Sequence, residues 1–140
     1  IMDILQKLGV EIGMKRSQTR TITAADIDTF ADLSGDHNPV HMDEEYGKKT
    51  IFGGRIAHGV ISLGLLSAAM AQLPGLPIFM SQSVRFLKPV RIGDTITASA
   101  EVIDMRPDKG IVTLKNTCTN QKGEVVIEGE AKCRLFERPA

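Results

Sequence analysis

The sequence predicts an α+β fold in which a curved antiparallel sheet wraps around one long central helix. Residues 58–73 are apolar on nearly every side, which is typical of a buried helix. From about residue 80 onward, apolar and polar residues alternate with a period of two, which is typical of half-buried strands. Short turns join these later segments, and they exclude the long crossovers that parallel strands require.

A helix is predicted within "RTITAADIDTFADLSG", residues 20–35, after the end of a strand. Thr23 can cap this helix, because Asp26 follows at the spacing of a capping box. Gly35 ends it. An apolar stripe on the helix is formed by Ile27, Phe30, Ala31 and Leu33. "DEEYGKK" then predicts a short exposed helix, and the glycine-rich "IFGGR" predicts a loop.

The second half of the chain predicts the central helix and four strands. "PGLP", residues 74–77, stops the helix that begins near His58. The strands are expected at residues 80–88, 95–105, 111–119 and 124–136. The apolar face of the third-last strand comprises Ile96, Ala98, Ala100 and Val102. That of the last comprises Val125, Ile127, Ala131, Cys133 and Leu135.

Composition narrows the class of protein. The 140 residues suit one domain spanning 1–140, and the 42% hydrophobic and 24% charged residues are ordinary for a globular protein. Lys plus Arg and Asp plus Glu number 17 each, and this balance argues against nucleic-acid or membrane partners, which favour a basic excess. The N-terminal residues show no signal-peptide pattern, so we expect a cytoplasmic protein.

The two cysteines are expected to be buried, reduced thiols. A hairpin that turns at "NQKG", residues 120–123, places Cys118 opposite about residue 125 and not opposite Cys133. Two cysteines are also too few for a zinc site.

The stretch "SGDHNPVH", residues 34–41, is the densest chemistry in the chain. It could be only a polar turn, because Asp, Asn, Gly and Pro are turn residues. His37 and His41 have the spacing of a helical metal pair, but Pro39 lies between them and breaks that alignment, so we expect no metal. Asp36 and His41 can instead form an acid/base pair that acts on water.

A second stretch, "AHGV", supplies what such a pair would need. If the central helix begins near Gly59, its first N–H groups lack intrahelical partners and its dipole adds positive potential there. Gly59 has no side chain, so a carbonyl oxygen can come close. It is therefore a candidate oxyanion site for a thioester that becomes an enolate. Taken alone, His58-Gly59 is also compatible with an ordinary helix start.

These residues resemble the MaoC-like hydratases of the hot dog fold, which include (R)-specific enoyl-CoA hydratases. The family motif Asp-x-Asn-Pro-x-His stands here at residues 36–41. "FGGRIAHGV" resembles the family's loop into the central helix, and "VRFLKPVRIGDTI" resembles the following strand and turn. The similarity covers roughly residues 15–136, with the three motifs in the family's order.

The resemblance implies that Asp36 and His41 are the catalytic pair and that the Gly59 N–H binds the thioester oxygen. Water would add to C3 of a 2-enoyl thioester, a proton would reach C2, and the product would have the (R) configuration. His37 falls at a variable position of the motif and is expected to be a bystander. Supporting residues of the site are expected at Asn38, His58 and Ser67.

An acyl group also needs an apolar pocket, and coenzyme A needs basic groups at its rim. The candidates for the pocket are Leu63, Leu66 and Met70, although such residues are more often plain core. The candidates for the rim are Arg55, Arg85, Lys88 and Arg91, although each alone is more often a solvated charge. The resemblance implies a homodimer or dimer of dimers with the sheets side by side, and no cofactor, since coenzyme A belongs to the substrate.

Three alternatives remain at this point. A hot dog thioesterase would hydrolyse the thioester, but the intact motif counts against it. A non-catalytic acyl-CoA-binding module would need neither Asp36 nor His41. A hydratase for a branched, dicarboxylic or carrier-protein-bound thioester would keep the whole motif, which reports the chemistry and not the acyl group.

Overall fold

The computed structural model describes residues 1–140 and contains five helices and five strands. Their bounds, in chain order, are α1 (Ile4–Leu8), β1 (Lys15–Thr21), α2 (Ala24–Ser34), α3 (Pro39–Met42), α4 (Glu44–Lys48), α5 (Gly59–Met70), β2 (Leu76–Phe86), β3 (Thr95–Arg106), β4 (Ile111–Thr119) and β5 (Val125–Phe136).

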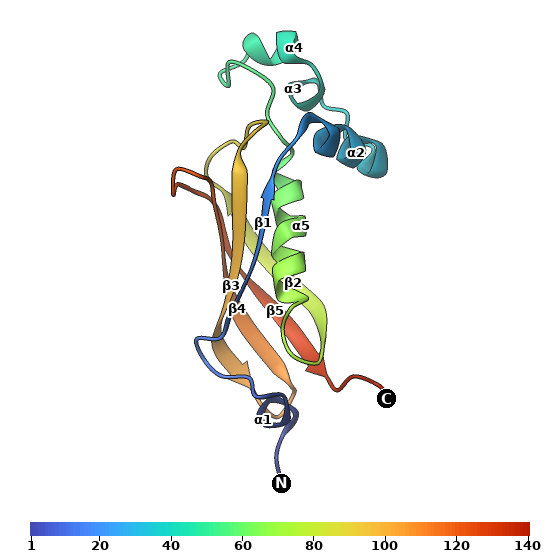
Figure 1. The fold of residues 1–140 in the computed structure, drawn as a ribbon, viewed down its shortest axis with the longest axis vertical. Coiled ribbons are helices and arrows are strands. Elements are labelled where there is room, and N and C mark those ends of the chain that lie inside the picture. Colours follow the sequence, from blue (N-terminus) through green and yellow to red (C-terminus); the bar gives the residue numbers. More distant parts are fainter.

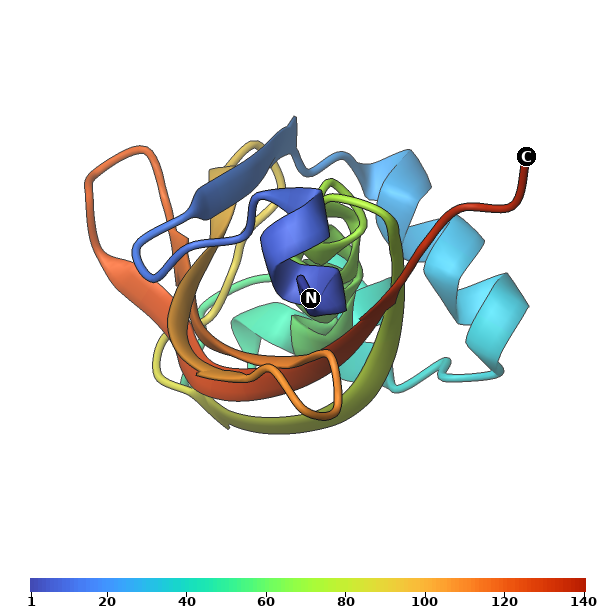
Figure 2. The ribbon, with the colours of Figure 1, turned by 90° about the horizontal axis from the view of Figure 1, so that it is seen from below.

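The five strands form one sheet in the order β1-β3-β4-β5-β2, and every neighbouring pair is antiparallel. The sheet curves strongly, and α5 lies along its concave side (Figures 1 and 2). β2 is an edge strand, although it comes before β3 in the chain. The prediction of a curved antiparallel sheet around a central helix is therefore confirmed.

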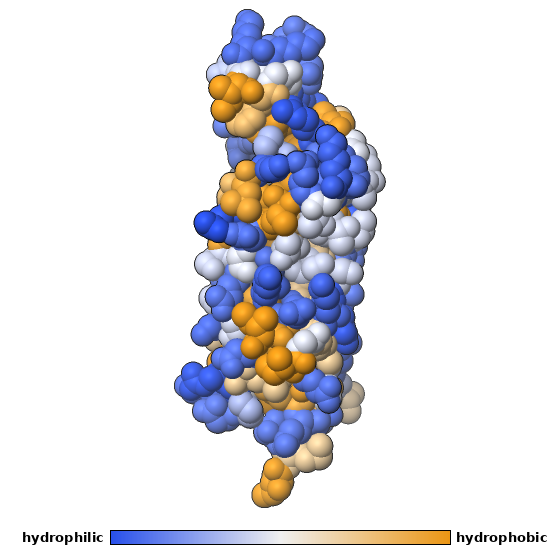
Figure 3. All heavy atoms as spheres, turned by 90° about the vertical axis from the view of Figure 1, so that its left-hand side faces the viewer, coloured by the Kyte–Doolittle hydropathy of each residue, from blue (hydrophilic) through white to orange (hydrophobic).

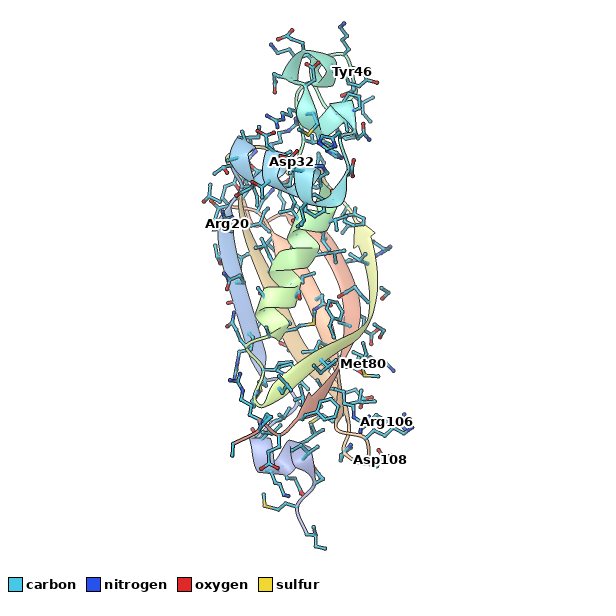
Figure 4. The ribbon with its side chains drawn as sticks, turned by 90° about the vertical axis from the view of Figure 1, so that its right-hand side faces the viewer. Arg20, Asp32, Tyr46, Met80, Arg106 and Asp108 are labelled. Carbon is cyan, nitrogen blue, oxygen red and sulfur yellow. The ribbon has the colours of Figure 1, made fainter.

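The helix α5 packs mainly against β1 and β3, at one side of the concave face. Its buried residues include Leu66, Ala69 and Met70, each at most 2% exposed. They meet the inward face of β3, whose predicted apolar residues are all fully buried. Figure 4 shows α5 lying across the strands, with α2 over its upper end. The buried helix and the alternating strands thus form one core, as their patterns predicted.

Two shorter helices cover the ends of this core. The helix α1 lies across the lower opening of the sheet (Figure 2), and its Leu5 is buried. The helix α2 buries Ile27 and Ala31, and Thr23 and Asp26 form both bonds of the predicted capping box. Leu33, which was expected in the apolar stripe, is 83% exposed because it falls on the solvent side of α2.

The cysteine prediction is confirmed: Cys118 and Cys133 are buried and not bonded to each other. Cys118 lies opposite Ile127 and not residue 125, because the β4–β5 connection includes a bulge beyond the predicted four-residue turn. Burial raises the pKa of the two thiols to about 12 and about 11, respectively.

The surface is mostly hydrophilic and is interrupted by several apolar patches along the face drawn in Figure 3. None of the helices combines the length and the apolar character that crossing a bilayer requires.

Candidate active site

The motif at residues 34–41 folds into a tight turn followed by one helical turn. The Asn38 N–H donates to a carboxylate oxygen of Asp36 at 3.2 Å, and the Asn38 side chain accepts from the Val40 N–H. Asn38 thereby caps α3, and Pro39 occupies the first helical position, where its missing N–H costs nothing. These local bonds fix Asp36 at the end of the turn and His41 on α3.

The imidazole of His41 is oriented by the segment that leads into α5. His41 Nδ1 lies 2.9 Å from the Ile56 carbonyl oxygen. A carbonyl only accepts, so Nδ1 carries a proton, and in the neutral ring Nε2 has the free lone pair. The Ile56 N–H donates to the Val40 carbonyl at 3.1 Å, and the Ala57 N–H donates to Val90 at 2.7 Å. His41 is thus held by backbone groups and presents a basic nitrogen.

The residues that begin α5 complete the site. His58 is the N-cap residue but makes no side-chain capping bond. Its Nε2 lies 2.9 Å from the backbone oxygen of Asp36, and its ring centroid lies 4.1 Å from that of His41. The Gly59 N–H has no acceptor within the chain, as expected for the first residue of a helix. The N-terminus of α5, with the partial positive charge of the helix dipole, therefore borders the same cavity as Asp36 and His41.

These groups line one cavity of about 420 Å³. Its walls include Asp36, His41 and Gly59, so the structure brings together the three residues that the sequence singled out. Two further polar residues, His58 and Lys88, line the cavity, and the rest of the lining is apolar and comes from Phe52, Ile56, Ala57, Val60, Phe86, Leu87, Pro89, Val90 and Ile127. A site that combines apolar walls with a few polar groups suits a small organic substrate.

Asp36, His41 and His58 are also residue types that bind metal ions, and one possible ligand atom of each lies within 4.8 Å of the others. His58 Nε2 is occupied by the Asp36 carbonyl, and its Nδ1 is shut off from solvent. The two imidazole planes meet at only 34°, so their in-plane lone pairs do not converge on one point. The arrangement suits hydrogen bonding better than metal coordination.

His37 lies outside this cluster. Its Nε2 is 3.2 Å from Asp32, and its side chain is exposed. The hydrogen bond to Asp32 raises the pKa of His37. Pro39 begins α3 after His37, so the two histidines of the motif are not on one continuous helix.

The expected acyl-pocket residues do not line the cavity. Leu66 and Met70 are in the closed core, and Leu63 is half-buried beside it. Ser67 is on the exposed side of α5. Because α5 is apolar on every side, its sequence does not indicate which face borders the cavity. This is why the predicted pocket residues differ from those that line the cavity.

Phe86 is a wall residue that the sequence analysis missed. Its ring lies directly against Gly59: a Cβ at position 59 would be 2.5 Å from Phe86 Cδ1. Position 59 therefore has room only for glycine while Phe86 keeps its place. "VRFLKP" was a motif of the resemblance, but nothing in one sequence indicated that this phenylalanine reaches the helix start.

The four basic residues expected at the rim have different surroundings. Arg55 acts as a clamp between two helices: its guanidinium donates to the backbone carbonyl of His41 on α3 and to Asp28 on α2. Only 14% of its side chain is exposed. Arg85 pairs with Glu128. Lys88 lines the cavity and pairs with Glu124 at 2.5 Å. Arg91 is exposed, and its side chain forms no ion pair.

Comparison with known proteins places this site in a family. Residues 7–122 match the family model described as the MaoC like domain. An (R)-specific enoyl-CoA hydratase of Rhodospirillum rubrum is 48% identical over 124 residues, covering 87% of this chain and 85% of that protein. A 3-hydroxybutyryl-CoA dehydratase of Methylorubrum extorquens is 39% identical over 128 residues, covering 90% of this chain and 81% of that protein.

The fold is shared as well. The solved structure of the (R)-hydratase from A. caviae, described as involved in PHA biosynthesis, superposes with a TM-score of 0.86. It is 36% identical and covers 91% of this chain and 98% of that one. With sequence and fold in agreement over nearly the whole length, the chain belongs to the MaoC-like family of hot dog hydratases.

Proposed function

We propose that this protein hydrates trans-2-enoyl-CoA to (R)-3-hydroxyacyl-CoA, and catalyses the reverse dehydration, with Asp36 and His41 as the catalytic pair. The observation that carries the proposal is the meeting of a carboxylate, a free imidazole nitrogen and an unpartnered helix N–H in one apolar cavity. Relatives named as hydratase and dehydratase, whose sequences match over most of this chain, support the reaction type.

The reaction follows from the orientation of these groups. Water held between His41 Nε2 and the Asp36 carboxylate attacks C3, and the pair accepts one of its protons. Electrons of the C2–C3 double bond move towards the thioester oxygen, which the Gly59 N–H stabilises as an enolate. A proton is then delivered to C2, and the pair returns to its starting protonation. One water is added and no electrons are gained or lost, so the reaction requires no redox cofactor.

The other residues in and near the cavity suit the two ends of the substrate, the acyl group and coenzyme A. The apolar side chains around Gly59, including Val60, Phe86 and Leu87, suit the acyl group of a short enoyl thioester. Arg91, which forms no ion pair, is the basic group most available to the phosphates of coenzyme A, and Lys88 lines the cavity but would have to exchange its ion pair with Glu124 for one with a phosphate. Arg55 and Arg85 are each committed to carboxylates within the chain.

We also propose that the protein is a homodimer joined along β2. This strand bonds only to β5, so its other edge is unpaired. Exposed apolar side chains at Ile78, Phe79 and Met80 line it, and Met80 is visible on this strand in Figure 4. An unpaired, apolar edge favours addition of a second strand. Sedimentation velocity should give a dimer, and Phe79→Lys with Met80→Lys should shift it towards monomer.

The hydration is tested with crotonyl-CoA. Loss of the conjugated enoyl-thioester absorbance without release of free thiol supports hydration, and chiral chromatography of the product tests the (R) configuration. Thiol release would indicate a thioesterase, and binding without either change, across chain lengths, would indicate a binding module. The same assay with enoyl thioesters of acyl carrier protein distinguishes the carrier.

The catalytic pair is tested by substitution. Asp36→Asn and His41→Ala should each lower kcat by at least about 10², the usual scale for a general acid or base. His37→Ala is the matched control, because it removes an exposed imidazole of the same motif, and it should change kcat little. Equal damage from His37→Ala and His41→Ala would contradict the assignment.

A further inference from the structure

His58 is a buried polar residue that the proposed reaction does not use. It is 2% exposed and lies between Asp36 and His41, more than fifteen residues from either in the sequence. Phe30 of α2 covers it, with the ring centroids 4.8 Å apart. One side chain thus contacts both members of the catalytic pair and directly precedes the oxyanion residue Gly59.

The hydrogen bonds of His58 define its protonation. The Asp36 carbonyl 2.9 Å from Nε2 can only accept, so Nε2 carries the proton. Nδ1 is buried and has no hydrogen-bond partner. A proton on Nδ1 would add a charge and an unsatisfied buried donor, both of which are costly. His58 is therefore a neutral imidazole with its proton on Nε2.

Histidine is an unusual choice for this position if helix stability were its purpose. Ser, Thr, Asp and Asn are the residues favoured at a helix N-cap, because their side chains accept N–H groups of the first turn. His58 makes no such bond, and the Gly59 N–H remains free. An Asp at position 58 would also bring negative charge to the place where the enolate oxygen develops charge.

We propose that His58 is a positioning residue, which fixes Asp36 through its backbone carbonyl and His41 through ring stacking, so that both face the Gly59 N–H. The proposal rests on the hydratase function stated above. Its physical basis is that one buried ring contacts Asp36 and His41 and belongs to the residue directly before Gly59. Displacement of a catalytic group by about 1 Å can cost 10²-fold in rate.

Two substitutions separate the two contacts. His58→Phe keeps a planar ring for stacking and loses the donor to Asp36. His58→Gln keeps an amide N–H near the place of Nε2 and loses the stacking. We expect His58→Phe to lower kcat about 10- to 10²-fold with KM changed by less than about 3-fold, and His58→Gln to recover part of the loss. His37→Gln, which alters the exposed histidine, is the matched control.

If His58 only stabilised the fold, its substitution would lower the thermal midpoint of unfolding. It would not lower kcat at a nearly unchanged KM with partial recovery in His58→Gln. The proposal is overturned if folded His58→Phe keeps kcat within about 3-fold of the parent, or if His58→Gln is no better than His58→Phe. Should either variant fail to fold, the other variant and the ¹⁵N–¹H spectrum of the unaltered protein decide.

A measurement on the unaltered protein distinguishes failure of this inference from failure of the proposed function. Long-range ¹⁵N–¹H spectra of histidine-labelled protein report the tautomer of each ring, and His37→Gln and His58→Gln assign the signals. We expect a neutral ring protonated on Nε2 for His58 and a proton on Nδ1 for His41. A charged His58, or one protonated on Nδ1, overturns the inference even if hydration proceeds. These tautomers in a protein without hydratase activity would instead refute the proposed function alone.

Discussion

Substituting Gly59 by alanine is a sharp test of the proposed oxyanion site. Gly59 is the first residue of α5 and has no positive φ, so the backbone there accepts alanine. The added methyl would nevertheless lie 2.5 and 2.6 Å from two carbons of the Phe86 ring. Ordinary contacts between carbon atoms are about 3.5–4.0 Å, so the ring must move by about 1 Å or more. The methyl itself would also crowd the N–H that meets the thioester oxygen.

Two effects of different size follow. Alanine keeps the backbone N–H, but its methyl hinders the approach of the thioester oxygen. Complete loss of one oxyanion donor typically costs about 10²–10³ in kcat, or about 2.7–4 kcal/mol of transition-state stabilisation, which sets the upper limit of this effect. Overpacking costs about 1–3 kcal/mol in the free energy of unfolding, and we expect the low end because Phe86 is at the end of its strand and 53% exposed. Gly59→Ala should therefore lower activity far more than stability.

Crotonyl-CoA kinetics and urea unfolding measure the two effects separately. Adding Phe86→Leu to Gly59→Ala should relieve the clash and recover stability, while kcat stays low because the methyl remains. Gly64→Ala is the matched control on the same helix, since its methyl would meet no atom within 4 Å. It should gain up to about 1 kcal/mol of stability without loss of kcat. Parental kcat in Gly59→Ala, or an equal loss in Gly64→Ala, would refute the oxyanion role.

Three further predictions concern groups around the core and site. Arg55→Met removes the donor to the His41 backbone carbonyl, and it should lower both the urea midpoint and kcat, with little change in KM if Arg55 is a clamp and not a coenzyme A ligand. The hydrogen bond from Arg20 lowers the pKa of Asp26 to about 2, so the pair stabilises the folded protein at pH values above the ordinary pKa of Asp. The difference in the free energy of unfolding between the parent and Arg20→Met should therefore be constant near neutral pH. It should shrink as the pH falls from about 4 towards 2. Because burial raises both thiol pKa values, neither cysteine should react with an aromatic disulfide reagent at pH 8 until urea unfolds the protein; rapid labelling of the folded protein would contradict the buried assignment.

Local patterns predicted the elements of this fold well because local physics determines them. The Thr23–Asp26 capping box, the alternating strands and the all-apolar helix each depend on residues close in sequence. The short helices α1 and α3 were not predicted. Pro39 was interpreted as a turn residue and as an interruption between two histidines, whereas it also serves as the first residue of a new helix.

The same distinction between local and long-range contacts applies to the residues of the site. Asp36 and His41 are close in sequence and share a motif, so they could be identified without a structure. The position of Phe86 against Gly59, the clamp made by Arg55 and the stacking of His58 on His41 are tertiary contacts between distant segments. A single sequence has no local signal for such contacts.

The role of Pro39 explains why only one histidine of the motif reaches the cavity. His37 precedes the proline and remains in the turn, where it meets Asp32 of α2. His41 follows it on α3, where the Ile56 carbonyl fixes its ring and Nε2 is left free. The backbone therefore changes direction between the two imidazoles. On one continuous helix, His37 would lie beside His41; here the ring beside His41 is that of the third histidine, His58. The chain thus builds its histidine pair across a tertiary contact, which leaves Nε2 of His41 without a partner in the chain and commits Nε2 of His58 to a backbone carbonyl.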